Sequence, residues 1–239
     1  YPTFLGAHAV PPEFLNKKEE YIKLICNEMI PEISKNKLAI FCDVFCEEGY
    51  FNIQESEQIL EVAKAYNLIP KIHADEFKYS GGVELAKKVG AISADHLMAI
   101  NNDGIKALSS SKVIGTLLPG TSFFLNKKYA NGRKLIDNGC QICLATDFNP
   151  GTCTIKSLPI IMFLSMYFCG MKLDESFKAI TYNAAKAIGQ DSSLGLIKEG
   201  YNADMIFWDI NSIDEIPYWF DSAPNKIKKI IKSGKTINL

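Results

Sequence analysis

Apolar and polar positions along the chain follow two patterns that alternate. Short apolar runs rich in Ile, Val, Leu, Cys and Phe occupy residues 38–45, 68–74, 91–98, 113–119 and 141–147. The segments between them carry apolar side chains at helical spacing, over residues 52–67, 81–90, 102–111 and 127–139. Continuous apolar runs indicate parallel strands that helices cover on both faces. The pattern therefore predicts a series of βα units.

The same pattern continues upstream of this series. Residues 3–8, TFLGAH, are typical of the end of another strand, and a helix is expected over about 17–34. This makes six strand ends, whereas a closed (β/α)8 barrel has eight strands. If the fold is such a barrel, we expect the chain to lack its first strands.

The texture changes in the last quarter of the chain. Two more helical patterns cover residues 157–169 and 174–188. From residue 189 onward, short apolar segments are separated by Gly and Asn, which predicts a few short β-strands. We therefore expect a large α/β domain over residues 1–188 and a small β portion over residues 189–239.

Polar clusters at the strand ends decide which α/β architecture is favoured. A Rossmann-like open sheet and a (β/α)8 barrel both fit the βα series, but no glycine-rich phosphate loop follows any predicted strand. In the barrel, the carboxyl ends of all strands meet at one mouth. Polar clusters follow four of the runs: DVFCEEG, HADE, ADH and TDFNPG. We predict an α/β fold of the (β/α)8 barrel type.

Composition narrows the classes of partner. The 239 residues are 47% hydrophobic and 22% charged, with a net charge of −1. The lysines and acids are spread through the chain, which argues against a nucleic-acid or membrane partner. The longest apolar stretch, residues 158–171, is shorter than the roughly 20 residues that cross a bilayer. Seven irregularly spaced cysteines favour a reducing compartment, the cytoplasm. A small-molecule ligand is expected.

Histidine is scarce, and its placement predicts a site. The three histidines of the chain, His8, His73 and His96, each stand at the end of a predicted strand. A single buried histidine is more often a hydrogen-bonded core residue than a ligand. In a barrel, however, His73 and His96 would converge with Glu76 and Asp147, and such a combination is typical of a functional site.

The motifs that carry these residues resemble a known enzyme family. The segments are TFLGAHAVPPEF, DVFCEEGYF, KIHADEF, SADHL and ATDFNPGT, followed by TYNAAKAIG and a GYNAD turn. Together they resemble the amidohydrolase superfamily, metal-dependent hydrolases with a (β/α)8 barrel beside a small β-sandwich. Within it the sequence is most similar to the imidazolonepropionase family, which opens the imidazolone ring of 4-imidazolone-5-propanoate to N-formimidoyl-L-glutamate in histidine degradation. The resemblance extends over essentially the whole chain.

The resemblance implies a divalent metal, Zn²⁺ or Fe²⁺. Such an ion lowers the pKa of bound water from about 15.7 toward 7, and imidazole and carboxylate groups suit it as ligands. His73 and Asp147 match the ligand positions of the family. The family also takes a His-x-His pair from the first barrel strand, which this sequence does not contain. The absence agrees with the expectation that the chain lacks its first strands.

The resemblance also implies roles for the other polar residues. Asp147 would contact the metal and accept a proton from the attacking water, and His96 would polarise the scissile carbonyl. Glu76 would bind the ring nitrogens and carry protons to the leaving nitrogen. His8 would bind the substrate ring. The propionate carboxylate would be bound by Asn149, Gly151 and Thr152.

Two other interpretations stay open at this point. The first is another cyclic-amide hydrolase or a deaminase of the superfamily, although no lysine ends the DVFCE strand as in most such relatives. The second is a truncated barrel that binds a ligand without turnover, which the missing His-x-His pair favours. Relatives form homodimers, so a homodimer is expected.

Overall fold

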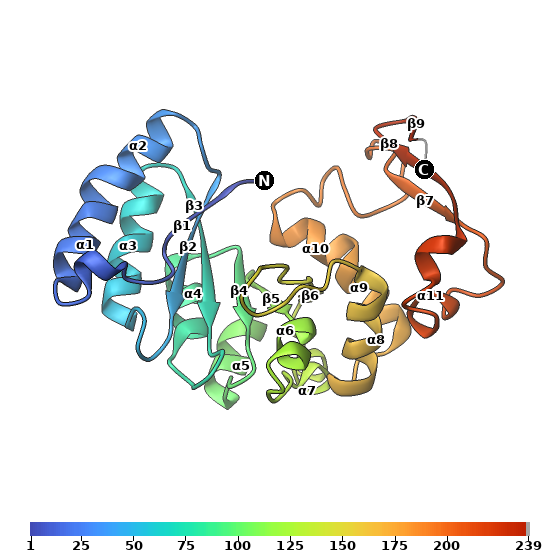
Figure 1. Cartoon of the computed structure of the whole chain (residues 1–239), viewed down its shortest axis with the longest axis horizontal. Coiled ribbons are helices and arrows are strands. Elements are labelled where there is room, and N and C mark those ends of the chain that lie inside the picture. The colour runs from blue at the N-terminus through green and yellow to red at the C-terminus, as the bar shows by residue number, and fades with distance from the viewer. Residues whose placement is uncertain (238–239) are drawn as a thin grey trace. The chain divides into compact units, whose positions relative to one another are not determined.

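The structure is a computed structural model that describes residues 1–237 (Figure 1). Its internal contacts divide the chain into two compact units. The first unit contains residues 1–116 and 137–141, and the second contains the other described residues. This division does not test the predicted boundary after residue 188, which stays a prediction.

The predicted parallel sheet is confirmed. Its six strands follow one another in sequence order, and the pairs β1–β2, β2–β3, β3–β4 and β4–β5 are parallel. The strands are β1 (Thr3–Ala7), β2 (Phe41–Cys46), β3 (Ile69–Ala74), β4 (Ser93–His96), β5 (Ile114–Leu117) and β6 (Ile142–Leu144). All six residues of β2 are buried, as expected for a strand covered on both faces. Each of the six predicted strands is present.

The helices of the first unit follow the strands as predicted, and Figure 1 shows them from blue to green. They are α1 (Lys18–Leu24), α2 (Ile30–Lys35), α3 (Ile53–Ala65), α4 (Gly82–Val89) and α5 (Asn102–Ser109). A wide turn, Ile25–Met29, joins α1 to α2 just before Pro31, whose missing N–H removes one helical hydrogen bond. Asn52 and Glu55 form a capping box that starts α3.

The second unit is mainly helical and ends in a small antiparallel sheet. Its helices are α6 (Pro119–Phe124), α7 (Gly132–Asp137), α8 (Leu158–Phe168), α9 (Leu173–Ile180), α10 (Tyr182–Ala187) and α11 (Glu215–Tyr218). The sheet has the order β7 (Met205–Trp208), β8 (Ile227–Lys232) and β9 (Lys235–Ile237), which confirms the short strands predicted after residue 189. The sequence pattern did not predict α6 or α11.

The register of the parallel strands places polar side chains at neighbouring strand ends. Phe45 of β2 lies opposite His73 of β3, and Ala74 of β3 lies opposite His96 of β4. The imidazoles of His73 and His96 therefore stand at the ends of two neighbouring strands, β3 and β4. None of the helices within residues 1–237 has the length and apolar character needed to cross a bilayer.

Candidate functional site

The backbone is strained where the predicted site residues begin. Asp75, His96, Leu97 and Asp147 have positive φ angles of 51°, 82°, 60° and 53°. Residues other than glycine rarely adopt this conformation, and it costs on the order of 1–3 kcal/mol for each residue. Such strain is concentrated at active sites and ligand-binding loops, so it marks the ends of β3, β4 and β6 as candidate sites.

The three histidines lie close together in the first unit. The ring of His73 lies with its centroid 5.7 Å from that of His8 and 5.2 Å from that of His96. The ring of Phe45 stacks on that of His8, with 5.2 Å between the ring centroids, and its centroid lies 5.4 Å from that of His73. The imidazoles therefore form one cluster at neighbouring strand ends, and the phenyl ring of Phe45 contributes to holding two of them.

A buried acid that sequence reasoning missed orients His73. Asp43, only 3% exposed, places Oδ1 2.8 Å from Nδ1 of His73. A carboxylate at Nδ1 favours the tautomer whose lone pair is on Nε2, which is the arrangement that supports a metal-binding imidazole. The sequence held one signal for Asp43, because it is the only acid within the six buried residues of β2.

His96 is buried beside an acid. Its Nε2 lies 3.4 Å from Oε2 of Glu76, and both side chains are less than 10% exposed. Within the described residues, Nδ1 of His96 is buried without a hydrogen-bond partner. Burial, together with the nearby charges of His73 and His8, lowers the pKa of His96 to about 3. His96 is therefore a neutral imidazole at physiological pH.

The loop that carries Glu76 is fixed by a second buried acid. Asp75 is fully buried, and its Oδ1 accepts hydrogen bonds from the backbone N–H of Ser80 at 2.8 Å and from Oγ of Ser80 at 3.2 Å. Burial raises the pKa of Asp75 despite these bonds. Ser80 in turn donates from Oγ to the carbonyl of Cys46 at 3.0 Å. The loop after β3 is thereby anchored to the end of β2.

Asp147 lies in the second unit at the end of β6. Oγ1 of Thr121, a residue of α6 with no exposed surface, donates to Oδ2 of Asp147 at 2.5 Å. No pattern in the sequence pointed to Thr121, since α6 was itself not predicted. The hydroxyl fixes the orientation of the carboxylate. The predicted convergence of Asp147 with the histidines of the first unit stays a prediction.

The predicted carboxylate-binding residues form one loop in the second unit. Oδ1 of Asn149 accepts from the backbone N–H of Gly151 at 2.8 Å and of Thr152 at 2.7 Å. Nδ2 of Asn149 donates to the carbonyl of Asp147 and to Oγ1 of Thr152, both at 2.8 Å. The three residues are therefore brought together, and the two backbone donors are occupied by the Asn149 side chain.

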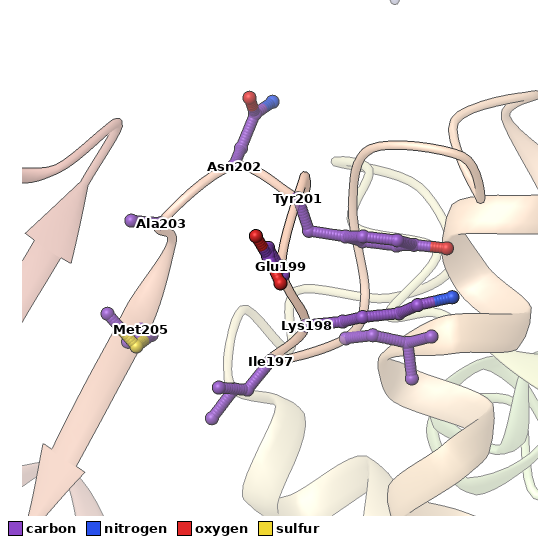
Figure 2. Close-up of a pocket in the computed structure, with 8 residues that line it drawn as sticks. Ile197, Lys198, Glu199, Tyr201, Asn202, Ala203 and Met205 are labelled. Carbon is purple, nitrogen blue, oxygen red and sulfur yellow. The ribbon is translucent and has the colours of Figure 1, made fainter.

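One cavity in the second unit lies apart from these residues. It has a volume of about 240 Å³ and is lined by residues from Leu196 to Met205, with the ammonium of Lys198 5.7 Å from the ring centre of Tyr201 (Figure 2). None of the site residues predicted from the sequence is among those that line it. It therefore adds nothing to the candidate site.

His73 is the side chain of the first unit whose surroundings best suit a metal ligand. Over residues 1–237, no group of three or more His, Cys, Asp and Glu side chains is arranged to hold a metal ion. The chemistry of His73 nevertheless suits a ligand, because Asp43 supports its ring from the opposite nitrogen. The first unit therefore contains one imidazole that fits a divalent metal.

Comparison with known proteins gives the family. The sequence model of the amidohydrolase family matches residues 3–237, nearly the whole chain. The chain belongs to the amidohydrolase family. All of the residues discussed above lie within the matched range, so the family relationship covers both units.

The curated relatives that are similar to this chain in sequence include several imidazolonepropionases. Imidazolonepropionase of Geobacillus kaustophilus (strain HTA426) is 47% identical over 235 residues, which are 98% of this chain and 55% of that protein. Imidazolonepropionase of Clostridium tetani (strain Massachusetts / E88) is 42% identical over 235 residues, 98% of this chain and 56% of that protein. The chain thus spans about half the length of the curated relatives it matches.

Solved amidohydrolase-type structures share the fold. An adenosine deaminase from Xanthomonas campestris with bound zinc aligns with a TM-score of 0.76 and 13% identity, covering 98% of this chain and 59% of that one. A 5-methylcytosine deaminase from Klebsiella pneumoniae with 5-fluorocytosine aligns with a TM-score of 0.71 and 16% identity, covering 92% and 59%. At these identities the likeness shows the fold alone, and it agrees with the predicted barrel class.

Proposed function

We propose that the protein is an imidazolonepropionase, which hydrolyses 4-imidazolone-5-propanoate to N-formimidoyl-L-glutamate. The observation that carries the proposal is the pair of neutral His96 and Glu76, 3.4 Å apart and beside His73 at adjacent strand ends. Hydrolysis of a cyclic amide needs a hydrogen-bond donor for the developing oxyanion and a group that moves a proton to the leaving nitrogen. The pair offers both.

His96 is proposed to act on the scissile carbonyl. Because its pKa is lowered to about 3, the imidazole is uncharged and donates a hydrogen bond through whichever nitrogen carries the proton. A fixed, buried donor of this kind stabilises an oxyanion by several kcal/mol, on the order of 3. His96 has a positive φ at the end of β4, a strained conformation that persists only where the surrounding structure fixes it.

Glu76 is proposed to bind the ring and to transfer protons. Its carboxylate is 6% exposed and would accept the N–H groups of the imidazolone ring. When water adds to the ring carbonyl and the C–N bond breaks, the proton lost by the water must reach the leaving nitrogen. A buried carboxylate within hydrogen-bond reach of that nitrogen serves as the carrier.

The proposal includes one divalent metal, zinc or ferrous iron, held by His73 and Asp147. A bound divalent ion supplies Lewis-acid chemistry, since it polarises a carbonyl and acidifies water. Asp43 orients His73 for this role, and Thr121 orients Asp147. Asp147 would also accept the proton of the attacking water. The assignment of Asp147 is supported by the sequence resemblance and by its hydrogen bond to Thr121.

The remaining predicted residues would bind the substrate. His8, which is exposed and stacks on Phe45, would contact the imidazolone ring. Asn149, Gly151 and Thr152 would bind the propionate carboxylate. Since Oδ1 of Asn149 now accepts the backbone N–H groups of Gly151 and Thr152, the carboxylate would have to take its place. A charged acceptor is favoured in that exchange, because charge-assisted hydrogen bonds are stronger than neutral ones.

The proposed setting is a homodimer in the cytoplasm. All seven cysteines are buried thiols that form no disulfide, which favours a reducing compartment. The homodimer is proposed from the family resemblance, and light scattering coupled to size exclusion measures it directly.

The test is turnover of 4-imidazolone-5-propanoate by the purified full-length protein, with metal content measured on the same sample. Activity with one zinc or iron per chain is the expected result. Glu76→Gln and His96→Asn should each lower kcat by about a hundredfold or more, as expected for proton transfer and oxyanion stabilisation. The control is Glu48→Gln, which removes one negative charge from a side chain that is 70% exposed, and it should leave kcat unchanged.

The same assay separates the alternatives. Turnover of another cyclic amide or of an aminopyrimidine, with none of the imidazolone, would replace the proposal by a different hydrolase or by a deaminase. Metal binding without turnover of any of these substrates would favour a ligand-binding protein.

A further inference from the structure

Glu47 is a buried acid for which the proposed reaction has no use. It follows β2 directly and is 2% exposed. Its own backbone is fixed, since its N–H donates to the carbonyl of Phe51 at 3.2 Å and its carbonyl accepts from Tyr50 at 3.0 Å. Phe51 is itself fully buried. Glu47 is therefore a rigid point at the end of β2.

The carboxylate of Glu47 is directed at the next loop. Oε2 accepts the backbone N–H of Phe77 at 3.0 Å, and Oε1 accepts that of Lys78 at 3.3 Å. Oε1 also accepts the N–H of Glu48 at 3.1 Å. Phe77 and Lys78, which supply two of these N–H groups, immediately follow Glu76 in sequence. Both oxygens of the acid thus hold the backbone of the residues next to Glu76.

The other hydrogen bonds described above hold the backbone of this loop at its ends. Asp75 and Ser80 bond to each other, and Ser80 bonds to Cys46. Glu47 contributes the contacts in the middle, where the Phe77 and Lys78 side chains are exposed and supply little burial. Exposed loops of this kind open locally unless their backbone groups are bonded.

We infer that Glu47 is the positioning residue of Glu76. It fixes the backbone that carries the Glu76 carboxylate against His96, and its importance for turnover rests on the proposed function. The role needs two acceptor oxygens at one place. Glutamine offers one oxygen and turns an NH₂ group toward a backbone donor, so Glu47→Gln breaks half of the arrangement without changing the size of the side chain.

Amide hydrogen exchange on the full-length protein tests the positioning directly. In Glu47→Gln, the amides of Phe77 and Lys78 should exchange about tenfold faster or more, while those of β2 and β3 keep their rates. Glu48→Gln is the matched control. Glu48 is the adjacent residue and reaches the same loop through Lys78 at 2.6 Å, but its side chain is 70% exposed. Its variant should leave both amides unchanged.

Steady-state kinetics give the second readout. Glu47→Gln should lower kcat by about tenfold to a hundredfold with a smaller change in KM, because a displacement of roughly 1 Å in a reacting group has that effect. Glu47→Asp keeps the charge but is one methylene shorter, so it should show an intermediate loss, and it serves as the test variant if the glutamine protein does not fold.

Three results would overturn the inference: unchanged exchange at Phe77 and Lys78 in both Glu47 variants, faster exchange spread evenly over the first unit, or normal kcat with a released loop. Failure of the proposed function is a separate outcome. If the unmodified protein does not turn over the imidazolone, the exchange measurement still decides whether Glu47 fixes the Glu76 loop.

Discussion

His96 combines burial with a neighbouring acid and yet stays neutral. Its side chain is 3% exposed, and water cannot solvate a charged ring there, so burial outweighs the attraction of Asp95. Folding stability therefore depends on pH, because His96 takes up a proton near pH 6.5 in the unfolded chain but stays neutral at that pH in the folded chain.

The stability of the metal-free protein should therefore depend on His96 in acid. The folded pKa of about 3 lies below the unfolded value of 6.5, so its contribution is fully present above pH 6.5 and is lost as the pH falls toward 3. In that window one such group lowers the free energy of unfolding by about 1.4 kcal/mol per pH unit. Urea unfolding of the wild-type protein and of His96→Asn between pH 5 and 8 measures the difference.

The His96→Asn protein lacks this proton, so its stability relative to wild type should improve steadily below pH 6.5. Two curves that run parallel from pH 8 to pH 5 would show that His96 titrates normally in the folded protein.

Asp43 provides a second test at the scale of one residue. Asp43→Asn keeps the shape of the side chain but removes the charge that supports His73 at Nδ1. If His73 is a metal ligand, zinc affinity should fall by about tenfold to a hundredfold, as for other lost supports of a ligand histidine. Competition with a chelating dye measures this. Asp103→Asn, an exposed acid on α5, should leave the affinity as it is.

At the scale of elements, the strand register builds a polar contact inside the sheet. Lys71 of β3 lies opposite Ser93 of β4, donates to its Oγ at 2.6 Å and lies 3.9 Å from Oδ2 of Asp95. Burial alone would raise the pKa of Asp95, but the charges of Lys71 and His73 and the hydrogen bonds lower it. The two strands are thereby joined by a nearly buried ion pair.

Breaking this pair should destabilise the first unit strongly. Lys71→Met fills the same volume but leaves the Asp95 carboxylate without its cation, at a cost of about 3 kcal/mol. Chemical unfolding monitored by far-UV circular dichroism measures this loss in the free energy of unfolding. Lys106→Met removes an ion pair whose partners are 79% and 73% exposed, and it should change stability by less than about 0.5 kcal/mol. An equal effect of both variants would contradict the burial argument.

Sequence periodicity predicted the elements with long, regular patterns and missed those fixed by single residues. The strands and α3 to α5 were found, because their apolar runs and helical spacing are clear. The short helix α6 starts at Pro119 directly after β5 and has no helical repeat of its own. The predicted helix over 174–188 is two helices, since Thr181 has a non-helical backbone between them.

The same distinction holds for the candidate site. The histidines and Glu76 were predicted because scarce or polar residues at strand ends are visible in a sequence. Asp43 and Glu47 were missed as partners, because their roles depend on which strand and which loop lie beside them. Thr121 depends in addition on a helix that was not predicted. Pairings between elements are set by register, which one sequence does not display.

At the scale of the whole molecule, the cysteines give a uniform property. All seven are buried, and burial raises the pKa of six of the thiols, to about 12 for Cys42 and Cys169 and to about 11 for Cys46 and Cys140. Other contacts add to this shift at Cys42 and oppose it in part at Cys46. The thiolate is the reactive form, so these cysteines should be inert while the protein is folded.

Ellman's reagent tests this for the complete protein. At pH 8 the native thiols of this chain should react at least about a hundredfold more slowly than those of a small free thiol, whereas all seven should react in guanidinium chloride. Rapid reaction of one or more thiols in the native state would show that part of the buried surface opens readily.

The left-handed backbone at Asp75, His96 and Asp147 also determines which variants can report on chemistry alone. Asparagine adopts this conformation more readily than almost any residue except glycine, whereas alanine and branched side chains resist it. An asparagine at these positions can therefore change charge or proton transfer while the chain path is kept. Alanine scanning would confuse a distorted loop with a lost function, and an asparagine scan of the strand ends would keep the two apart.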